Sequence, residues 1–435
     1  MFTLLVAAAV AAPNPARTEK PTAAGLMVIV KRSDAPVAAA RPGDPPPPAL
    51  SGTEFAAVRE EAGRVLIRLQ GRDVWIGRTD IMTPKEAVEF YTAQINSQPQ
   101  STSYYVRRAK AHELLADWDA AIKDYDDIIR LSPQQFAYLN NRANYYSRKH
   151  EYQKALAGYD EAIKLSATAF IPRGNRGNTF INMRDWDKAV EAYDDSLKVN
   201  PNYARGYAGR SAAWREKREY KKALADAERG VELEPNSPHT LLARGLARAA
   251  LKDFDPALAD LDEALRFDPQ FAAGYLGRAG VHLSRRSYQP AMRDLDTAMR
   301  LSPKFAAAMA KRADVWVACG NPRRALADLD EAIAADPSYG PAYRQKAWLL
   351  ATHPDDTVRD SKAAVAAAKK AIDLSPNPDG ETCEAVAAAH AAADEFPAAV
   401  EWQKKALADV AFAKESGEPV RRRLELYEAG KPYRE

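Results

Sequence analysis

One 34-residue stretch decides the fold: residues 204–237 read ARGYAGRSAAWREKREYKKALADAERGVELEPNS. Small and apolar residues recur in it at helical spacing, and a proline lies near its end. The same arrangement occupies seven consecutive units without a gap. Such a period predicts a stack of helix pairs, because one pair alone buries too little apolar surface and its neighbours must complete the core. The units begin at Thr102, Phe136, Phe170, Ala204, Pro238, Ala272 and Ala306.

Four positions of each unit carry the same packing chemistry. Position 8 is always small, position 24 is Tyr, Ala or Leu, and position 32 is Pro in every unit except the second, which has Ala167. We expect small residues at positions 8 and 20 to let the two helices approach closely, with position 24 filling the remaining space. The proline ends the second helix because it cannot continue the hydrogen-bond ladder. Position 20 is Ala in all units: Ala121, Ala155, Ala189, Ala223, Ala257, Ala291 and Ala325.

These residues match the pattern of the tetratricopeptide repeat (TPR), and the chain therefore resembles that family. The resemblance implies a mainly α-helical protein, a TPR α-solenoid in which helix hairpins stack into a right-handed superhelix with a concave groove. In the family, the groove is lined chiefly by positions 2, 5, 6, 9, 12 and 13 of the first helix of each hairpin.

The pattern extends beyond the seven regular units at residues 102–339. Residues 83–99 predict an N-terminal capping helix, which begins with the capping sequence Thr-Pro-Lys-Glu. Residues 340–411 predict two irregular units. Residues 412–435 predict a C-terminal capping helix that ends at Gly430, followed by a tail.

A small antiparallel β-domain is predicted at residues 26–82, before the helices. Its segment 41–50, RPGDPPPPAL, is a Pro-rich loop, since its prolines exclude both helix and central strand. The closing sequence RDVWIGRTDIM at 72–82 resembles the last strands of a bacterial SH3-like barrel. The whole layout resembles bacterial secreted or envelope TPR proteins with an N-terminal SH3-like domain. The expected strands lie at 26–30, 55–60, 64–70 and 73–77.

The amino terminus reads as an export signal. Residues 1–12, MFTLLVAAAVAA, form a short apolar run that ends in small residues suited to signal peptidase, and residues 13–25 are then a linker. This predicts a secreted or periplasmic protein. The alternative is a disordered Ala-rich terminus on a cytoplasmic protein. No later stretch approaches the roughly 18 apolar residues that span a bilayer, so no transmembrane span is expected.

Composition and motifs exclude several function classes. Lys plus Arg number 62 and Asp plus Glu 59, and this balance predicts no nucleic-acid binding, which needs a concentrated basic face. Two cysteines and six scattered histidines predict no metal site. Phosphate-binding loops and nucleophile motifs are missing from the sequence, so we expect no catalytic residues, no cofactor and no enzymatic activity.

Two opposite charge ladders run through the regular units. Because every unit has an arginine at position 7 and an acid at position 25, we interpret the arginines as structural ion-pair partners rather than as a phosphate site. The arginines are Arg108, Arg142, Arg176, Arg210, Arg244, Arg278 and Arg312. The acids are Asp126, Asp160, Asp194, Glu228, Asp262, Asp296 and Asp330.

Polar residues gather on the expected groove face of the first units. An asparagine carries both a donor and an acceptor, so a row of them can pair with the backbone of an extended peptide, and basic residues can receive carboxylates. We expect the side chains of Asn141, Asn144, Asn175 and Asn178 to stay outside the core. The alternative is a solvated polar face without a ligand. The candidate peptide-binding residues are Asn140, Asn141, Asn144, Asn175, Asn178, Asn182, Arg107, Lys110, Arg148 and Arg205.

The sequence therefore predicts a non-enzymatic scaffold that binds a protein or peptide in the groove of a TPR solenoid. The alternative is an envelope-structural protein whose SH3-like domain binds cell-wall material. The sequence names neither the partner nor the oligomeric state.

Overall fold

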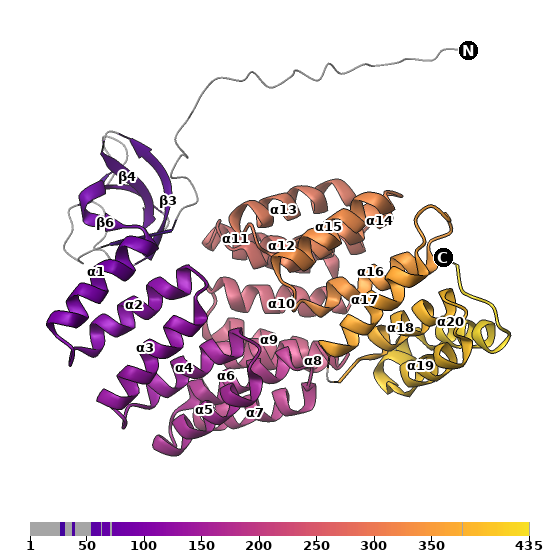
Figure 1. Ribbon diagram of the computed structural model, residues 1–435, viewed down its shortest axis with the longest axis horizontal. Helices are drawn as coiled ribbons and strands as arrows, with labels where there is room; N and C mark the ends of the chain where they lie inside the picture. Colours follow the sequence, from indigo (N-terminus) through magenta and orange to yellow (C-terminus); the bar gives the residue numbers. More distant parts are fainter. Residues whose placement is uncertain are drawn as a thin grey trace, which may run out of the picture. The chain divides into compact units, whose positions relative to one another are not determined.

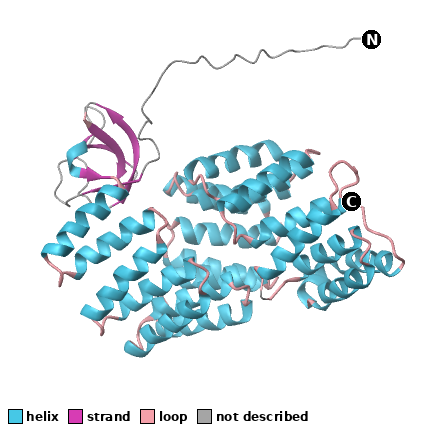
Figure 2. Ribbon diagram, in the orientation of Figure 1, coloured by secondary structure: helices cyan, strands magenta, loops and turns pink. Residues whose placement is uncertain are grey.

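The computed structural model describes residues 27–30, 37–39, 54–61, 63–69, 72–375 and 377–434. The chain divides into two compact units, with the boundary between Asp117 and Trp118. The first unit contains the strands and two helices, and the second contains only helices (Figure 1, Figure 2). The expected signal peptide at 1–12, the linker at 13–25 and the Pro-rich loop at 41–50 lie outside the described residues.

An antiparallel sheet forms the β-part of the first unit, with strand order β2-β5-β4-β3-β1-β6. Four of its strands confirm the β-rich runs of the sequence, and Gly63 (φ 73°) makes the turn between β3 and β4. β2 has no counterpart among the predicted strands, because three residues are too few to show an alternation. The strands are β1 Met27–Val30, β2 Val37–Ala39, β3 Glu54–Glu61, β4 Arg64–Leu69, β5 Arg72–Gly77 and β6 Ile81–Met82.

The capping helix α1 (Pro84–Ser97) begins where the sequence predicts it. The Glu86 amide donates to Thr83 Oγ1 at 3.3 Å, and the Thr83 amide donates back to the Glu86 carboxylate at 2.7 Å. This bond to the Thr83 backbone is the main reason why the pKa of Glu86 is lowered. Tyr91 of α1 packs with Ile29 of the sheet, so the first unit has a core shared between strands and helices.

Helix pairs fill the rest of the chain, and nearly all follow the 34-residue period. α2 (Thr102–Leu114) belongs to the first compact unit. The second unit holds α3 Trp118–Leu131, α4 Phe136–Arg148, α5 Tyr152–Leu165, α6 Phe170–Asn182, α7 Trp186–Val199, α8 Ala204–Glu216, α9 Tyr220–Leu233, α10 Pro238–Ala250, α11 Phe254–Phe267, α12 Ala272–Ser284, α13 Tyr288–Leu301, α14 Ala306–Ala318, α15 Pro322–Ala335, α16 Gly340–Thr352, α17 Ser361–Asp373, α18 Gly380–Ala392, α19 Phe396–Ala408 and α20 Val410–Glu428.

Close approach within the hairpins of the second compact unit confirms the roles of positions 8, 20 and 24. All seven alanines at position 20 are completely buried. At position 8 of the third unit, a Cβ added to Gly177 would lie 2.8 Å from the ring of Tyr193, which occupies position 24. At position 8 of the fourth unit, the Ser211 hydroxyl donates to the Ala223 carbonyl at 2.7 Å. A larger side chain on either helix would force the pair apart.

The turn inside each regular hairpin uses a left-handed residue at position 15. In the third unit Arg184 has φ 60°, and the Asp185 amide reaches back to the Phe180 carbonyl at 2.9 Å, which satisfies the free end of the helix. This conformation costs a non-glycine residue roughly 1–2 kcal/mol. Six units nevertheless use one: Ala116, His150, Arg184, Arg218, Lys252 and Arg286, with Gly320 in the seventh.

The last helix is longer than the sequence predicts. α20 begins at Val410, because the Asp409 carboxylate accepts from the Phe412 amide at 3.0 Å, and it runs through Pro419. It ends before Gly430 (φ 66°), as the sequence predicts. Tyr427 of α20 is buried against the last hairpin, which confirms the capping role.

Replacement of Ala223 by Leu tests the hairpin contact. Because Ala223 is fully buried, the larger side chain should overpack the contact and lower the free energy of unfolding by about 1–3 kcal/mol. Urea unfolding followed by circular dichroism measures this loss. Ala225 is exposed on the same helix, so Ala225→Leu is the matched control and should leave the unfolding midpoint unchanged. Equal stability of the two variants would contradict the assigned register.

Candidate peptide-binding site

A cavity of about 1280 Å³ lies within the second compact unit. Its first wall comes from three consecutive hairpins, at the ends of α4, α6 and α8 and the turns after them. Because these hairpins share one period, the wall repeats positions 12, 13 and 15 of each unit. The residues at these positions are Ser147, Arg148, His150, Ile181, Asn182, Arg184, Arg215, Glu216 and Arg218.

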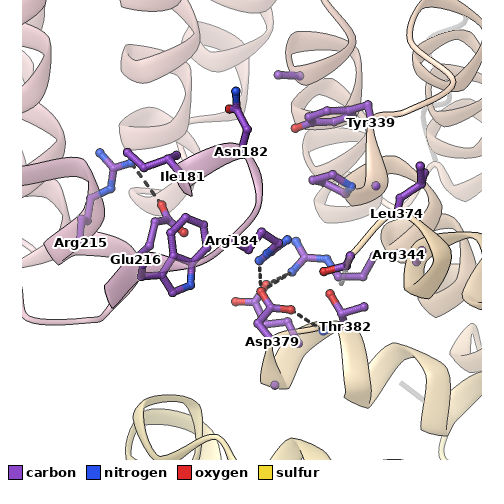
Figure 3. Close-up of a pocket in the computed structure, with 18 of the residues that line it drawn as sticks. Ile181, Asn182, Arg184, Arg215, Glu216, Tyr339, Arg344, Leu374, Asp379 and Thr382 are labelled. Atoms are coloured by element: carbon purple, nitrogen blue, oxygen red, sulfur yellow. Dashed lines mark hydrogen bonds and ion pairs between the residues drawn. The ribbon is translucent and has the colours of Figure 1, made fainter. Parts of the chain in front are cut away.

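The second wall of the cavity comes from the irregular units. Tyr339 lies just before α16, and Arg344 lies in its first turns. Leu374 comes directly after α17. Asp379 and Thr382 lie at the start of α18. Figure 3 shows Arg184 of the first wall pointing toward Asp379 of the second. The array therefore brings together residues that are almost 200 positions apart in the sequence.

Ion pairs connect the two walls. Arg184 binds the Asp379 carboxylate, and Arg218 binds Glu415 and lies 3.5 Å from Glu381. Arg344, from the second wall, shares this cluster: it binds Glu381 and lies 4.0 Å from the Asp379 carboxylate. We call these six residues the ionic seam: Arg184, Arg218, Arg344, Asp379, Glu381 and Glu415.

Asp379 has two roles in the seam. Its carboxylate caps α18 by accepting from the Thr382 amide at 2.9 Å, and it also binds Arg184. Burial works to raise the pKa of Asp379, but the positive charges of Arg184 and Arg344 outweigh burial and hold that pKa below its ordinary value. Asp379 is therefore ionised at neutral pH and stabilises the seam as an anion.

Neutral hydrogen bonds join the walls beside the seam. His150, at the left-handed turn position of the second unit, has its Nε2 atom 2.7 Å from the Ser338 hydroxyl. Tyr152 lies next to this contact, and burial together with the Asp336 charge raises its pKa to about 12. Burial also raises the pKa of Tyr339. Both phenols are uncharged at neutral pH and can donate hydrogen bonds.

Neither metal-binding nor membrane-spanning features occur in the part of the chain that the structure describes. No three His, Cys, Asp or Glu residues come together there as metal ligands. None of the described helices has both the length and the apolar character needed to cross a bilayer.

A family model of the tetratricopeptide repeat matches residues 175–238. The match runs from within α6 to the start of α10 and so includes part of the first cavity wall. This part of the chain consists of tetratricopeptide repeats. The same 34-residue packing and turn geometry extend through the other regular hairpins on both sides of the matched residues.

Solved structures with similar folds include tetratricopeptide repeat proteins. One from Parabacteroides merdae is 18% identical, with a TM-score of 0.44 over 64% of this chain and 100% of its own. Yeast Tom70 is 15% identical, with a TM-score of 0.47 over 80% of this chain and 85% of its own. YrrB, described as having an unusual peptide-binding site, is 20% identical, with a TM-score of 0.28 over 43% of this chain and 97% of its own. A comparison with curated protein sequences finds no match.

The candidate residues named from the sequence separate into groups in the repeat array. Asn182 and Arg148, both at position 13, line the cavity. The guanidinium carbon of Arg148 also lies 5.5 Å from the ring centre of Trp118. The other five asparagines and the exposed Arg205 are in the second compact unit but do not line the cavity. Arg107 and Lys110 lie on α2, in the first compact unit.

Two of the asparagines bond to the hydroxyl groups of buried tyrosines, although Asn144 itself is half-buried and Asn178 is exposed. Within the second hairpin the Tyr159 hydroxyl donates to Asn144 Oδ1 at 2.8 Å, and within the third the Tyr193 hydroxyl donates to Asn178 Oδ1 at 2.5 Å. Both tyrosines are almost completely buried at position 24. A buried phenol needs a partner, and the asparagine at position 9 supplies it.

Other asparagines connect neighbouring hairpins. Asn141 Nδ2 donates to the Tyr125 hydroxyl at 3.2 Å, and Asn175 Nδ2 donates to Asn140 Oδ1 at 2.9 Å. Asn140 is itself buried. These amides therefore contribute to the stacking of the repeats, and the side chains best placed to meet a ligand are those that line the cavity.

The arginine ladder is structural, as the opposite charges predict. Arginines at position 7 donate to the acid at position 25 of the preceding unit, so the ladder joins units to one another. Five such pairs have N–O distances of 2.5–3.0 Å: Arg142–Asp126, Arg176–Asp160, Arg210–Asp194, Arg278–Asp262 and Arg312–Asp296.

The sequence did not lead us to predict a second acidic partner for these arginines. In units four to seven the arginine also binds an aspartate at position 23 of its own unit, at 2.6–2.7 Å. These aspartates, Asp226, Asp260, Asp294 and Asp328, are 3–8% exposed. Their recurrence at 34-residue spacing was the available signal. Removing one partner of such a buried pair typically costs about 3–5 kcal/mol, because the other charge stays buried.

Units two and three lack an acid at position 23 and use a different polar contact. Position 23 is Gly158 in unit two and Ala192 in unit three. Within the described structure, the buried Nε atoms of Arg142 and Arg176, the arginines of these two units, have no hydrogen-bond partner. The same two units carry the asparagine–tyrosine bonds, so a polar contact at positions 9 and 24 replaces the ionic contact at positions 7 and 23.

Replacement of Asp379 by Asn tests the charge in the ionic seam. Asn keeps the cap on α18, but the lost charge should lower the free energy of unfolding at pH 7 by about 1–3 kcal/mol. Because the pKa of Asp379 is depressed, its contribution is complete above the ordinary value of 3.8 and is lost as the pH falls through the lower folded-state value. Urea midpoints of both proteins, measured from pH 7 downward, should converge in acid. A difference that persists unchanged in acid would contradict this role.

Proposed function

We propose that this tetratricopeptide repeat protein is a non-enzymatic scaffold that binds a segment of a partner protein in the cavity. One observation carries the proposal: groove-facing positions of three consecutive hairpins form one wall of a cavity of about 1280 Å³. The family match supports the proposal, because it is to a repeat that is defined by its packing and not by catalytic residues.

The size of the cavity favours a peptide over a small metabolite. Pockets for small molecules usually enclose about 300–1,000 Å³, and this cavity is larger. Its first wall extends over three repeats, so an elongated ligand can contact equivalent positions in successive units. A peptide segment has this repeating form.

The chemistry of the walls favours a polar ligand. Asn182 is exposed and offers both a donor and an acceptor at the first wall. Lys311 of α14 also lines the cavity and is partly exposed beside Asp314, 2.8 Å away. Apolar surface comes from residues such as Ile181 and Leu374. This combination suits a segment with both polar backbone and apolar side chains.

A bulky residue inside the cavity tests the proposal. Ala307, at position 2 of its unit, lines the cavity, whereas Ala273, at position 2 of the preceding unit, does not. Peptides are first selected from a random displayed library on the full chain. Ala307→Trp should then weaken their binding at least tenfold, because the indole occupies the space that the peptide needs. Titration calorimetry measures the dissociation constants.

The matched variant Ala273→Trp carries the same change at the same repeat position and should bind within twofold of the wild type. Circular dichroism spectra of both variants should match the wild type. If Ala307→Trp binds the selected peptides as tightly as Ala273→Trp, the cavity is not the binding site.

The alternative function, an envelope-structural role for the β-domain, remains a prediction from sequence. It requires that the sheet be SH3-like and bind cell-wall material. In the described residues of the sheet, no observation favours it over peptide binding by the repeats. Sedimentation of the full chain with purified cell-wall material is its direct test.

We also propose export of the protein, which rests on the apolar sequence at 1–12 alone. Signal peptidase should then cut close to Ala11 or Ala12, and the preprotein should migrate more slowly than the mature form. N-terminal sequencing of the native protein checks this. A sequence that begins at Met1 would exclude cleavage.

A further inference from the structure

The ionic seam joins hairpins that the repeat architecture does not join. In a stack of repeats each hairpin packs only against its neighbours, so such arrays are nearly one-dimensional. Arg184 and Arg218 belong to the third and fourth units, whereas Asp379 and Glu415 lie next to the ninth. The seam therefore closes the array on itself and completes the rim of the cavity.

Contacts across the seam are polar. Besides the ion pairs, the Tyr220 hydroxyl donates to Glu415 at 3.1 Å, and the Arg218 guanidinium carbon lies 5.5 Å from the ring centre of Phe412. The Glu381 and Glu415 side chains, which pair with Arg218, are 48% and 49% exposed, whereas Asp379, which pairs with Arg184, is 20% exposed. Ion pairs as exposed as those of Arg218 are weakened by salt, because mobile ions screen the attraction.

Neighbouring hairpins also share ion pairs of the arginine ladder, but buried apolar side chains pack between them as well. α18 packs on α16 and α17 through buried residues that include Leu350, Ala364 and Val386. This apolar contact does not depend on salt in the same way. A small rotation at each hairpin interface between units four and eight would therefore separate the seam while each neighbouring contact is kept.

We propose that the ionic seam is a latch that opens and closes the cavity. In the closed state Arg184 and Arg218 hold the start of α18 and α20 across the cavity. In the open state these ion pairs and the neighbouring His150–Ser338 contact are broken, and the cavity is open to large molecules. The repeats between the two walls bend elastically when the latch opens. Ionic strength sets the equilibrium between the open and closed states.

The other repeats contain a natural control for the latch. Arg286 has the same position 15 and the same left-handed backbone as Arg184 and Arg218. It is exposed and does not line the cavity. Charge reversal at Arg286 therefore changes the same repeat position and the same net charge without touching the seam.

The distance between two spin labels, measured by double electron–electron resonance, tests the latch. Labels are placed at Lys221→Cys on α9 and Lys414→Cys on α20, both exposed, in a chain with Cys319→Ala; the remaining Cys383 is buried. We expect one short distance at 50 mM salt and a second, longer distance at 500 mM. Arg218→Glu should give the longer distance already at 50 mM, and Arg218→Glu combined with Glu415→Arg should restore the short one.

Access to the cavity is measured separately and needs no peptide. A cysteine at Ala307, with Cys319→Ala, should react with a maleimide carrying a 5-kDa polyethylene glycol at least threefold faster in the Arg218→Glu chain than in the Arg286→Glu chain. Circular dichroism shows whether the variants are folded. Distances that stay the same in wild type at both salt concentrations, or equal reaction rates in the two folded variants, would overturn the latch. Either result would leave the proposed peptide binding intact.

Discussion

Every hairpin of this array depends on one close contact, between the alanine at position 20 and the small residue at position 8 of the opposite helix. Where position 8 is Ser211, its hydroxyl reaches the carbonyl of Ala223, and where it is Gly245, an added Cβ would lie 3.1 Å from the carbonyl oxygen of Ala257. Backbones at this separation leave room for a Tyr or Leu side chain at position 24 in most units, and the fourth unit has Ala227 there. Since the contact recurs in each unit, all hairpins have nearly the same shape and can stack into a regular coil.

This regularity also brings oppositely charged side chains together at the same positions of successive units. An arginine at position 7 meets an acid of the preceding hairpin and, in the later units, a buried aspartate of its own hairpin. These guanidinium groups form ion pairs within and between neighbouring repeats. Much of the basic charge of the array therefore stabilises the stacking of its hairpins. The near-equal numbers of acids and bases in the sequence reflect this pairing. The arginines that connect the cavity walls, Arg184 and Arg218, lie elsewhere, at position 15.

The left-handed turn at position 15 shows how one local geometry acquires different roles. The turn ends the first helix of each hairpin and directs the side chain away from the hairpin core. In the fifth and sixth units that side chain, Lys252 or Arg286, is exposed. In the third and fourth units it faces the distant ninth unit and forms ion pairs. The difference comes from the coil of the array, which returns the chain to the neighbourhood of these two turns.

The sequence by itself determined the repeat, the positions of its helices and the pairing of its two charge ladders. These features depend on contacts within 34 residues or between adjacent units, where periodicity reveals the partner. The seam of Arg184 with Asp379 could not be read in this way, because its members are almost 200 residues apart and meet only through the accumulated rotation of several hairpins. The hydrogen bonds of the asparagines could not be read from the sequence either. Position 9 belongs to the groove face, but Asn144 and Asn178 are short enough to turn toward the buried tyrosines, and only the packed hairpin decided that they do.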